Sequence, residues 1–375
     1  MDTLEVHEVN SRRNLREFIL FPFSLYKDCP YWIPPLIREE LTLFDRSKNP
    51  AFEFCECRQW IVRKNGKAVG RIAGIIHGLE AESSKTARFG WIDFIDDPEV
   101  SKLLLHQVET WFKAKDIEQI HGPFGFNDMD PEGMLVEGFD SPATITTIFN
   151  FDYYPSHLEQ LGYKKSADWI EWNIGPVVDT PDRLRKGAQL VEKRFKVRSK
   201  RFHGKKELIE WAAEMFKVLN QSFQHLHGFQ TLSPRQIEFY LHKYLSFIDP
   251  QFISIIINDR DEVVGFGIAM PSLSQAFKKA RGRLFPFGIL HILRGIRHRE
   301  EIEMCLIGVR PDYQRKGIIA LIFRDMNTAF FRSGFKTVRS NAVLEDNKEV
   351  HKLFRVYGDL LKVHKRRRCY TKTLV

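Results

Sequence analysis

The chain has 375 residues, which is enough for two domains of ordinary size. With 43% hydrophobic and 28% charged residues it has the composition of a folded soluble protein, and no apolar run approaches the roughly 18 residues that cross a bilayer. The formal charge of +9 favours an anionic partner, such as a nucleotide-bearing cofactor, a lipid surface or nucleic acid, without choosing among them.

The first residues are too polar for a signal peptide, and the number of cysteines is odd. Cys55 and Cys57 have no second pair that would complete a metal site, so we expect reduced thiols, no metal and a cytoplasmic protein.

The first half of the chain predicts a mixed α/β unit that begins with a helical and then loop-like stretch over residues 1–57. An Asn65-Gly66 turn indicates a β-hairpin, and Pro98 marks the start of a helix. An irregular segment rich in Gly, Pro and Asp, residues 122–144, is too long for a plain connector and is a candidate for lining a site. The predicted strands are Gln59–Arg63, Ala68–His77, Arg88–Ile95 and Tyr163–Ile174, and Tyr153–Gly162 is a predicted short helix.

The second half repeats this order of elements after a Pro-rich and charged junction at residues 175–195. Ala68-Val69-Gly70 corresponds to Val263-Val264-Gly265, and a second pair of matching stretches, at 158–163 and 353–358, also lies about 195 residues apart. The sequence therefore predicts two tandem α/β domains, residues 1–180 and 190–375. Each would be a mixed, mostly antiparallel sheet flanked by helices.

One stretch of the second domain, residues 301–334, predicts a strand, a tight loop and a helix. The short apolar run from Ile302 to Val309 indicates a strand buried on both faces, which Pro311 ends because proline has no N–H for a sheet. Gly317 opens a helix with one apolar face, and Gly334 would close it as a left-handed cap.

The loop between them, Gln314 to Gly317, is a candidate anion site. Free N–H groups point out of a helix N-terminus, and Arg315 and Lys316 add two positive charges, which suits a pyrophosphate. The nucleotide-binding motifs G-x-x-x-x-G-K-[ST] and G-x-G-x-x-G are absent from the stretch. The first copy is acidic at the matching place, Asp96-Asp97-Pro98, where a phosphate would be repelled, so we interpret it as a structural or acceptor-binding partner.

Val309, Pro311, Gln314 and Gly317 follow the V-x-P-x-x-Q-x-x-G-x-[GA] signature of the GNAT acyltransferase superfamily, which this stretch resembles, although Ile319 replaces the usual second Gly or Ala. The resemblance implies an acyl-CoA or acetyl-CoA co-substrate. It implies that Gln314, Arg315, Lys316, Gly317 and Ile318 hold the pyrophosphate, while the strand with Leu306, Ile307 and Val309 pairs with the pantetheine arm.

The resemblance also implies a base and an acid. Glu303 falls where several members of the family carry the base, and Glu301 shares its face of the strand; otherwise both are solvated charges at a strand edge. The tyrosine that protonates the departing thiolate in the family is replaced by Phe354, which leaves Tyr357 as the candidate acid or a packing residue. Asn347 would either contact the cofactor or cap a helix, and the residues before it, Thr337–Leu344, are a predicted strand beside the cofactor.

Residues 275–300 distinguish the chain from a minimal member of the family, because they mix basic with apolar side chains. This pattern suggests peripheral contact with an anionic inner-membrane surface, an acyl-chain tunnel with a basic mouth, or a plain surface helix.

The stretch from Gly138 to Pro142 and the one from Tyr153 to Tyr163, in front of a GNAT half, resemble a bacterial tandem-GNAT group that includes ceramide synthases. The resemblance implies an N-acyltransferase that transfers an acyl group to an amine, such as a long-chain amino lipid. The alternatives are acetyl transfer to a small amine or peptide, and a non-catalytic module on an anionic membrane or nucleic acid. Nucleic acid is disfavoured because no binding motif is found, and we expect the basic tail at 364–368 to form the solvated face of a terminal strand.

Overall fold

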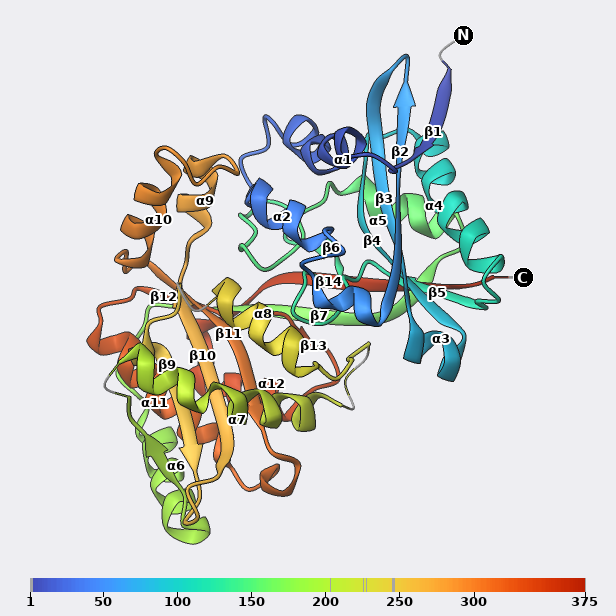
Figure 1. The fold of residues 1–375 in the computed structure, drawn as a ribbon. Helices are drawn as coiled ribbons and strands as arrows, with labels where there is room; N and C mark the ends of the chain where they lie inside the picture. The colour runs from blue at the N-terminus through green and yellow to red at the C-terminus, as the bar shows by residue number, and fades with distance from the viewer. Residues whose placement is uncertain (1–2, 203, 225, 227, 245–246, 375) are drawn as a thin grey trace. The chain divides into compact units, whose positions relative to one another are not determined.

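A computed structural model of the chain describes residues 3–202, 204–224, 226, 228–244 and 247–374 (Figure 1). It divides into two compact units. The N-terminal unit comprises residues 3–169, 273–292 and 365–374, and the C-terminal unit comprises residues 170–272 and 293–364.

The N-terminal unit is built on a sheet in the order β1-β2-β3-β4-β5-β14. β4 and β5 run parallel, whereas the other neighbours in this order are antiparallel. A short strand, β6 (Met134–Glu137), pairs with β14, and α4 packs on β2 and β3 with its apolar face. The strands are β1 (Leu4–Glu8), β2 (Cys55–Lys64), β3 (Lys67–His77), β4 (Thr86–Phe94), β5 (Gln119–Gly122) and the end of β14 (Leu361–Thr373); the helices are α1 (Arg12–Leu25), α2 (Ile37–Leu43), η1 (Pro50–Glu53), α3 (Gly78–Ser84), α4 (Pro98–Lys113), α5 (Tyr153–Gln160) and α9 (Ser274–Ala280).

The C-terminal unit has a sheet in the order β8-β9-β10-β11-β12-β7, in which only β11 and β12 are parallel. Its strands are β8 (Arg198–Lys200), β9 (Ile253–Ile257), β10 (Val263–Pro271), β11 (Glu301–Val309), β12 (Thr337–Arg339), β13 (Val343–Leu344) and the end of β7 (Lys164–Ile174). Its helices are α6 (Asp182–Phe195), α7 (Lys205–Phe223), α8 (Pro234–Tyr244), η2 (Pro250–Phe252), the end of α10 (Gly288–Ile296), η3 (Pro311–Tyr313), α11 (Ile318–Arg332), α12 (Lys348–Phe354) and η4 (Arg355–Leu360).

The two halves of the chain carry the same succession of elements, and they exchange their last strands. Tyr370 of β14, at the end of the second half, pairs with Gly122 of β5 in the N-terminal unit. Ile174 of β7, at the end of the first half, pairs with Val338 of β12 in the C-terminal unit. Each unit is therefore completed by a strand from the other half.

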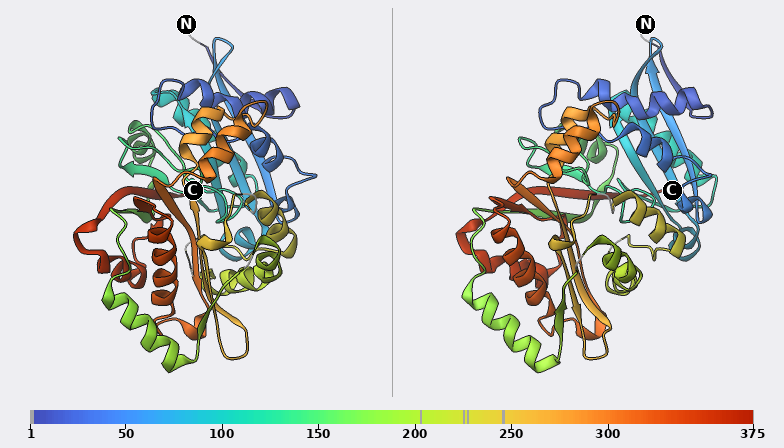
Figure 2. Two further views of the ribbon diagram at one scale, coloured as in Figure 1. Left: turned by 90° about the vertical axis from the view of Figure 1, so that its left-hand side faces the viewer. Right: turned by 60° about the vertical axis from the view of Figure 1, so that its left-hand side comes forward.

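The sheet of the C-terminal unit lies between α7 on one face and α11 with α6 on the other (Figure 2). The side chain of Ser222 in α7 lies over Gly308 of β11, whereas Ile322 and Met326 of α11 lie over Gly267 of β10. A Cβ at Gly267 would be 2.5 Å from Ile322, so the glycine lets the helix approach the strand closely. This packing fixes the N-terminus of α11 beside the end of β11.

The structure corrects three sequence predictions. The N-terminal stretch contains β1, which was not predicted. The predicted strand Thr337–Leu344 is divided into β12 and β13. Between them, the N–H of Ser340 donates to the carbonyl of Trp172, and the Ser340 hydroxyl accepts from the N–H of Trp172. The basic tail lies in β14 as predicted, but Lys365 and Arg367 are fully buried instead of solvated, since they donate to backbone carbonyls within residues 138–148.

Candidate active site

The two parallel strands at the centre of the C-terminal unit separate after three residue pairs. Glu301, Ile302 and Glu303 of β11 pair with Thr337, Val338 and Arg339 of β12, and β11 then continues to Val309 alongside β10 alone. Cys305, Leu306 and Ile307 are partly exposed in this part of β11. The divergence leaves a strand edge of peptide groups that can accept an extended ligand by strand-like pairing. Leu306, Ile307 and Val309, predicted to contact pantetheine, lie along this edge.

Glu303 is the last paired residue of β11 and has a carboxyl group suited to proton transfer. Its side chain is 4% exposed, and Oε1 accepts a hydrogen bond of 2.6 Å from the hydroxyl of Ser272. Burial raises the pKa of Glu303 to about 7; the nearby carboxylates of Glu301 and Glu171 add to the rise, and Ser272 and Arg339 oppose it. A carboxyl group that titrates near neutral pH can take up and release a proton at working pH.

Glu301 has different surroundings, although it shares the strand face with Glu303. A guanidinium nitrogen of Arg339 donates to Glu301 Oε2 at 2.7 Å, and the Arg339 side chain is 10% exposed. This ion pair occupies one carboxylate oxygen of Glu301. Of the two glutamates, Glu303 therefore has the environment of a base. Neither is a solvated charge at the sheet edge.

The predicted anion loop joins β11 to α11 and leaves the helix N-terminus open. Gly317 is the N-cap residue with φ of +81°, and no side chain caps the helix. A Cβ at Gly317 would lie 2.8 Å from Val191 of α6, so both the backbone conformation and the space require glycine. Gln314 holds the loop to the strand, because its Nε2 donates to the carbonyl of Val309 at 3.2 Å. The N–H groups of the first turn of α11 therefore point into the space in front of the loop.

Two exposed cations flank this helix end. Arg315 and Lys316 are exposed, and within the described part of the chain neither forms an ion pair with a carboxylate. Lys316 instead lies over the rings of Tyr313 and Phe195, at 4.7 and 5.6 Å. Arg310 differs, because it donates twice to Asp312 and once to Glu262. The positive charge available to an anion therefore comes from Arg315 and Lys316 together with the helix dipole.

A polar hollow of about 500 Å³ adjoins the start of this loop. It is lined by the second half of α7, from Glu214 to Gln224, by the start of β10, and by the turn from Arg310 to Asp312. Its volume lies within the range of small-molecule sites. The divergent strand, the loop and this hollow all belong to the C-terminal unit. The turn from Arg310 to Asp312 connects the strand to the loop and also lines the hollow.

The structure places the remaining predicted residues in the packed part of the C-terminal unit. Tyr357 is 8% exposed and its hydroxyl donates to Asn327 Oδ1 at 3.4 Å; burial raises its pKa. Phe354 is buried against Phe323. The side chain of Asn347 caps α12 by accepting from the N–H of Val350, which confirms the predicted capping. Of the predicted catalytic pair, Glu303 lies on the divergent strand, while the hydroxyl of Tyr357 is held by α11.

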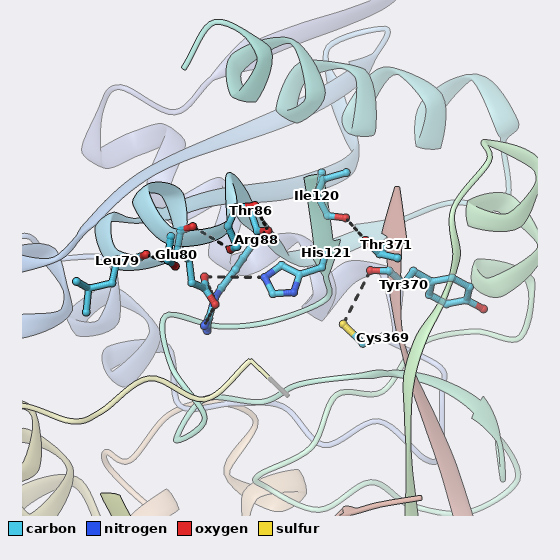
Figure 3. Close-up of polar contacts among 11 residues, drawn as sticks. Leu79, Glu80, Thr86, Arg88, Ile120, His121, Cys369, Tyr370 and Thr371 are labelled. Carbon is cyan, nitrogen blue, oxygen red and sulfur yellow. Dashed lines mark hydrogen bonds and ion pairs between the residues drawn. The ribbon is translucent and has the colours of Figure 1, made fainter. Parts of the chain in front are cut away.

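The matching centre of the N-terminal unit carries the opposite charge. β4 and β5 are also paired over three residues, with Arg88 opposite His121 where β11 and β12 have Glu303 opposite Arg339. Arg88 is fully buried and binds Glu80 of α3 with two nitrogens, and His121 lies beside the same carboxylate (Figure 3). Burial would raise the pKa of Glu80, but the bonds from His121 and Arg88 outweigh it and lower the pKa. An arginine in an ion pair cannot serve as a base.

The helix that follows β4 is closed to anions as well. Asp97 caps α4, accepting from the N–H of Glu99 at 3.1 Å, and Pro98 contributes no N–H. A carboxylate therefore occupies the position that is open at Gly317. The acidic sequence around Asp97 predicted that the first copy lacks the anion loop. The replacement of Glu303 by Arg88 at the matching strand position was not predicted, because only the strand register shows that the two positions correspond.

The N-terminal unit has a cavity of its own, of about 130 Å³, and the irregular segment 122–144, a predicted candidate for lining a site, contributes Pro123 and Thr144 to its wall. Trp32, Trp91 and Phe149 are among the aromatic residues that line it. Its polar wall is the buried ion pair of Arg71 with Asp93, 2.7 Å between Nε and Oδ2. The cavity is similar in size to engineered cavities that hold a single small ring.

Comparison with known proteins assigns the chain to a family. Residues 207–358 match the model of the acetyltransferase (GNAT) family. Over 97% of its length, the chain is 30% identical to Protein YghO of Escherichia coli K12, of which 94% is covered. The chain is a tandem GNAT protein. It is also 24% identical to the bacterial ceramide synthase of Caulobacter vibrioides, with 96% of this chain and 98% of that protein covered.

Solved structures show the same fold. The tandem GNAT protein of the clavulanic acid pathway matches with a TM-score of 0.57 at 12% identity, and the match covers 100% of this chain and 99% of that one. A probable N-acyltransferase from Enterococcus faecalis matches with a TM-score of 0.52 at 9% identity, covering 99% and 73%. The protein is thus an enzyme of the N-acyltransferase class, which sets aside the non-catalytic alternative, and enzymes of this family use acyl-CoA or acetyl-CoA. None of the described helices is both long and apolar enough to cross a bilayer.

Proposed function

We propose that the enzyme transfers an acyl group from a long-chain acyl-CoA to the amine of a long-chain amino lipid, with Glu303 as the base. The observation that carries this proposal is the buried Glu303 carboxyl group, with a pKa of about 7, on a strand that leads into an uncapped helix N-terminus. Both features lie in the C-terminal unit, whereas the matching positions of the N-terminal unit carry Arg88 in an ion pair with Glu80 and a helix capped by Asp97.

In the proposed reaction, Glu303 accepts a proton from the attacking amine while the nitrogen bonds to the thioester carbonyl carbon. Peptide N–H groups along the free edge of Leu306–Val309 would stabilise the oxyanion of the tetrahedral intermediate. The C–S bond then breaks, and the departing thiolate takes a proton. We assign that proton to Tyr357, whose hydroxyl would have to leave Asn327. Tyr357→Phe at unchanged turnover would overturn this second assignment without affecting the first.

The same proposal assigns the parts of the co-substrate to the loop. The backbone of Gly317 and Ile318, with Gln314, Arg315 and Lys316, would hold the pyrophosphate at the open helix end. Leu306, Ile307 and Val309 would pair with the pantetheine arm. The side-chain oxygen of Asn347 already accepts a hydrogen bond from the N–H of Val350. Its side-chain NH₂ group would therefore be the part that contacts the co-substrate.

The choice of a long-chain amine rests on the likeness to the bacterial ceramide synthase, which extends over nearly the whole chain. Peripheral contact with a membrane surface through residues 275–300 belongs to the same proposal, because amphiphilic substrates reside there. The alternative substrate pair is acetyl-CoA with a small amine, for which the same Glu303 chemistry would serve.

The test is to incubate the protein with acetyl-, octanoyl- and palmitoyl-CoA, each with a sphingoid base and with a small amine. Products are measured by mass spectrometry, because thiol reagents would also titrate the partly exposed Cys29 and Cys305. The proposal expects N-acylated sphingoid base from the long-chain donor, and at least a hundredfold less from Glu303→Gln. Product from acetyl-CoA and the small amine alone would establish the alternative, and full turnover by Glu303→Gln would refute the assignment of the base.

A further inference from the structure

Between α9 and the end of α10, large apolar side chains are exposed on one short segment. Phe285 and Phe287 are 71% and 68% exposed, and Leu290 and Leu293 of α10 are 48% and 53% exposed. Single exposed apolar residues are ordinary on protein surfaces, but four within nine residues form a patch. We call residues 285–293 the apolar tip; it follows α9, which is orange in Figure 1.

The base of the apolar tip is firmly held in the N-terminal unit. Phe277 of α9 is buried, and the carbonyl of Gly282 accepts from the N–H of Ile37 at 2.9 Å. Gly282 has φ of +74°, and a Cβ there would lie 2.6 Å from the ring of Phe23. The hydroxyl of Ser274 donates to the carbonyl of Ala143. The exposure of the tip is therefore a property of a packed structure and not of a frayed end.

Positive charge surrounds the tip without any compensating acid. No Asp or Glu occurs between residues 272 and 299, although the chain as a whole has 48 acidic residues. Five of the basic side chains there are exposed, and among the described residues they have no ion-pair partner: Lys279, Arg281, Arg283, Arg294 and Arg297. Exposed apolar side chains are thus preceded and followed in the chain by unpaired cations, of which Lys279, Arg281 and Arg283 lie in the N-terminal unit with Phe285 and Phe287.

We infer that the apolar tip and the cations that flank it in the chain form a binding surface for an anionic lipid bilayer. Phenylalanine and leucine enter the boundary between headgroups and acyl chains, while arginine and lysine bind the anionic headgroups beside them. A nucleic acid duplex would match the charge but would not cover the exposed Phe285 and Phe287, and a single strand would stack on these rings but leave the aliphatic Leu290 in water. A second copy of the same surface would bring like charges together. The inference names the lipid class and the inserting residues for the proposed membrane contact, but needs no particular acyl acceptor.

The experiment is co-sedimentation of the full chain with vesicles of phosphatidylcholine alone or with 30% phosphatidylglycerol. We expect binding to the anionic vesicles, at least tenfold weaker binding to the neutral ones, and loss of affinity with rising salt. Phe285→Ser with Phe287→Ser should weaken binding about tenfold or more at every salt concentration. Arg281→Glu with Arg283→Glu should weaken it chiefly at low salt. The matched controls are Leu79→Ser and Leu190→Ser, which remove equally exposed side chains from α3 and α6.

Several results would overturn the inference. These are equal binding to neutral and anionic vesicles, unchanged binding of the double phenylalanine variant, or a concentration-dependent dimer that this variant abolishes. Acyl transfer from a short-chain acyl-CoA to a water-soluble amine, measured without vesicles, separates the two proposals. The tip variants should retain this activity, whereas Glu303→Gln should lose it while still binding vesicles. Retained activity also shows that the tip variants are folded.

Discussion

Replacing Glu303 by glutamine should change both catalysis and stability in a pH-dependent way. In the folded protein its pKa is about 7, against an ordinary value of 4.5, because the carboxyl group is buried. The folded state therefore holds one more proton than the unfolded state between these values. The cost of burying the ionised carboxylate is absent below pH 4.5, grows up to pH 7 and is complete above it.

The size of this effect follows from the shift. A rise from 4.5 to about 7 corresponds to about 3 kcal/mol, at about 1.4 kcal/mol for each pKa unit. Glutamine has the same shape without the charge. The stability of Glu303→Gln relative to wild type should thus increase by about 3 kcal/mol as the pH rises from 4.5 to 8. Any other effect of the amide adds a difference that does not change with pH.

The assay is calorimetric unfolding of both proteins across this pH range, together with kcat/KM for acyl transfer. The difference in Tm should widen by roughly 2–4 °C per kcal/mol. The wild-type kcat/KM should rise with pH through about 7 as Glu303 loses its proton, and this inflection should vanish in the variant. Glu301→Gln is the matched control, since it removes a carboxylate of the same strand that is not the proposed base: the inflection in kcat/KM should persist, at a lower pH because Glu301 contributes to the raised pKa of Glu303. A pH-independent difference in Tm would refute the reasoning, because Glu303 would then titrate alike in both states.

Three further predictions concern the loop, the matching centre and the exchanged strand. Gly317→Ala should weaken coenzyme A binding tenfold or more in a calorimetric titration, while Gly334→Ala, with a similar φ of +77° but open space around it, should leave the affinity unchanged. Arg88→Met should cost about 3–5 kcal/mol in denaturant unfolding by leaving the buried Glu80 with His121 as its remaining charged neighbour, and adding Glu80→Met should recover part of that loss. Deleting residues 365–375 should unfold the N-terminal unit, seen as loss of amide-exchange protection in β5; retained protection would contradict this.

Sequence patterns were sufficient for the duplication and the loop, because those features depend on local signals. The strand ends before Pro311, which lacks an N–H, and the helix begins after Gly317 and ends before Gly334, which both have positive φ. Each of these effects depends on the residue type alone. The same is true of Asp97, whose acidic neighbourhood indicated that the first copy lacks the anion loop.

The features that were missed depend on which residues meet in space. Lys365 and Arg367 looked like a solvated basic tail, and only the fold brings the carbonyls of a distant loop to them. The exchange of β7 and β14 is likewise invisible, since both strands have the pattern expected of a strand that closes its own domain. The environment of Glu303 required Ser272, about thirty residues earlier in the chain.

The two copies differ at both positions that the proposed reaction needs, and this leads to a last prediction about stoichiometry. One copy pairs a buried glutamate with an uncapped helix, and the other pairs Arg88 with a helix that Asp97 has already capped. Either change alone would disable a copy, because a CoA thioester needs both the anion site and the base. The chain should therefore bind one coenzyme A, with a calorimetric stoichiometry of one that falls to zero in Gly317→Asp. A stoichiometry of two, or one that persists in the variant, would show that the capped helix still accepts a phosphate and that a carboxylate at the N-cap does not exclude it.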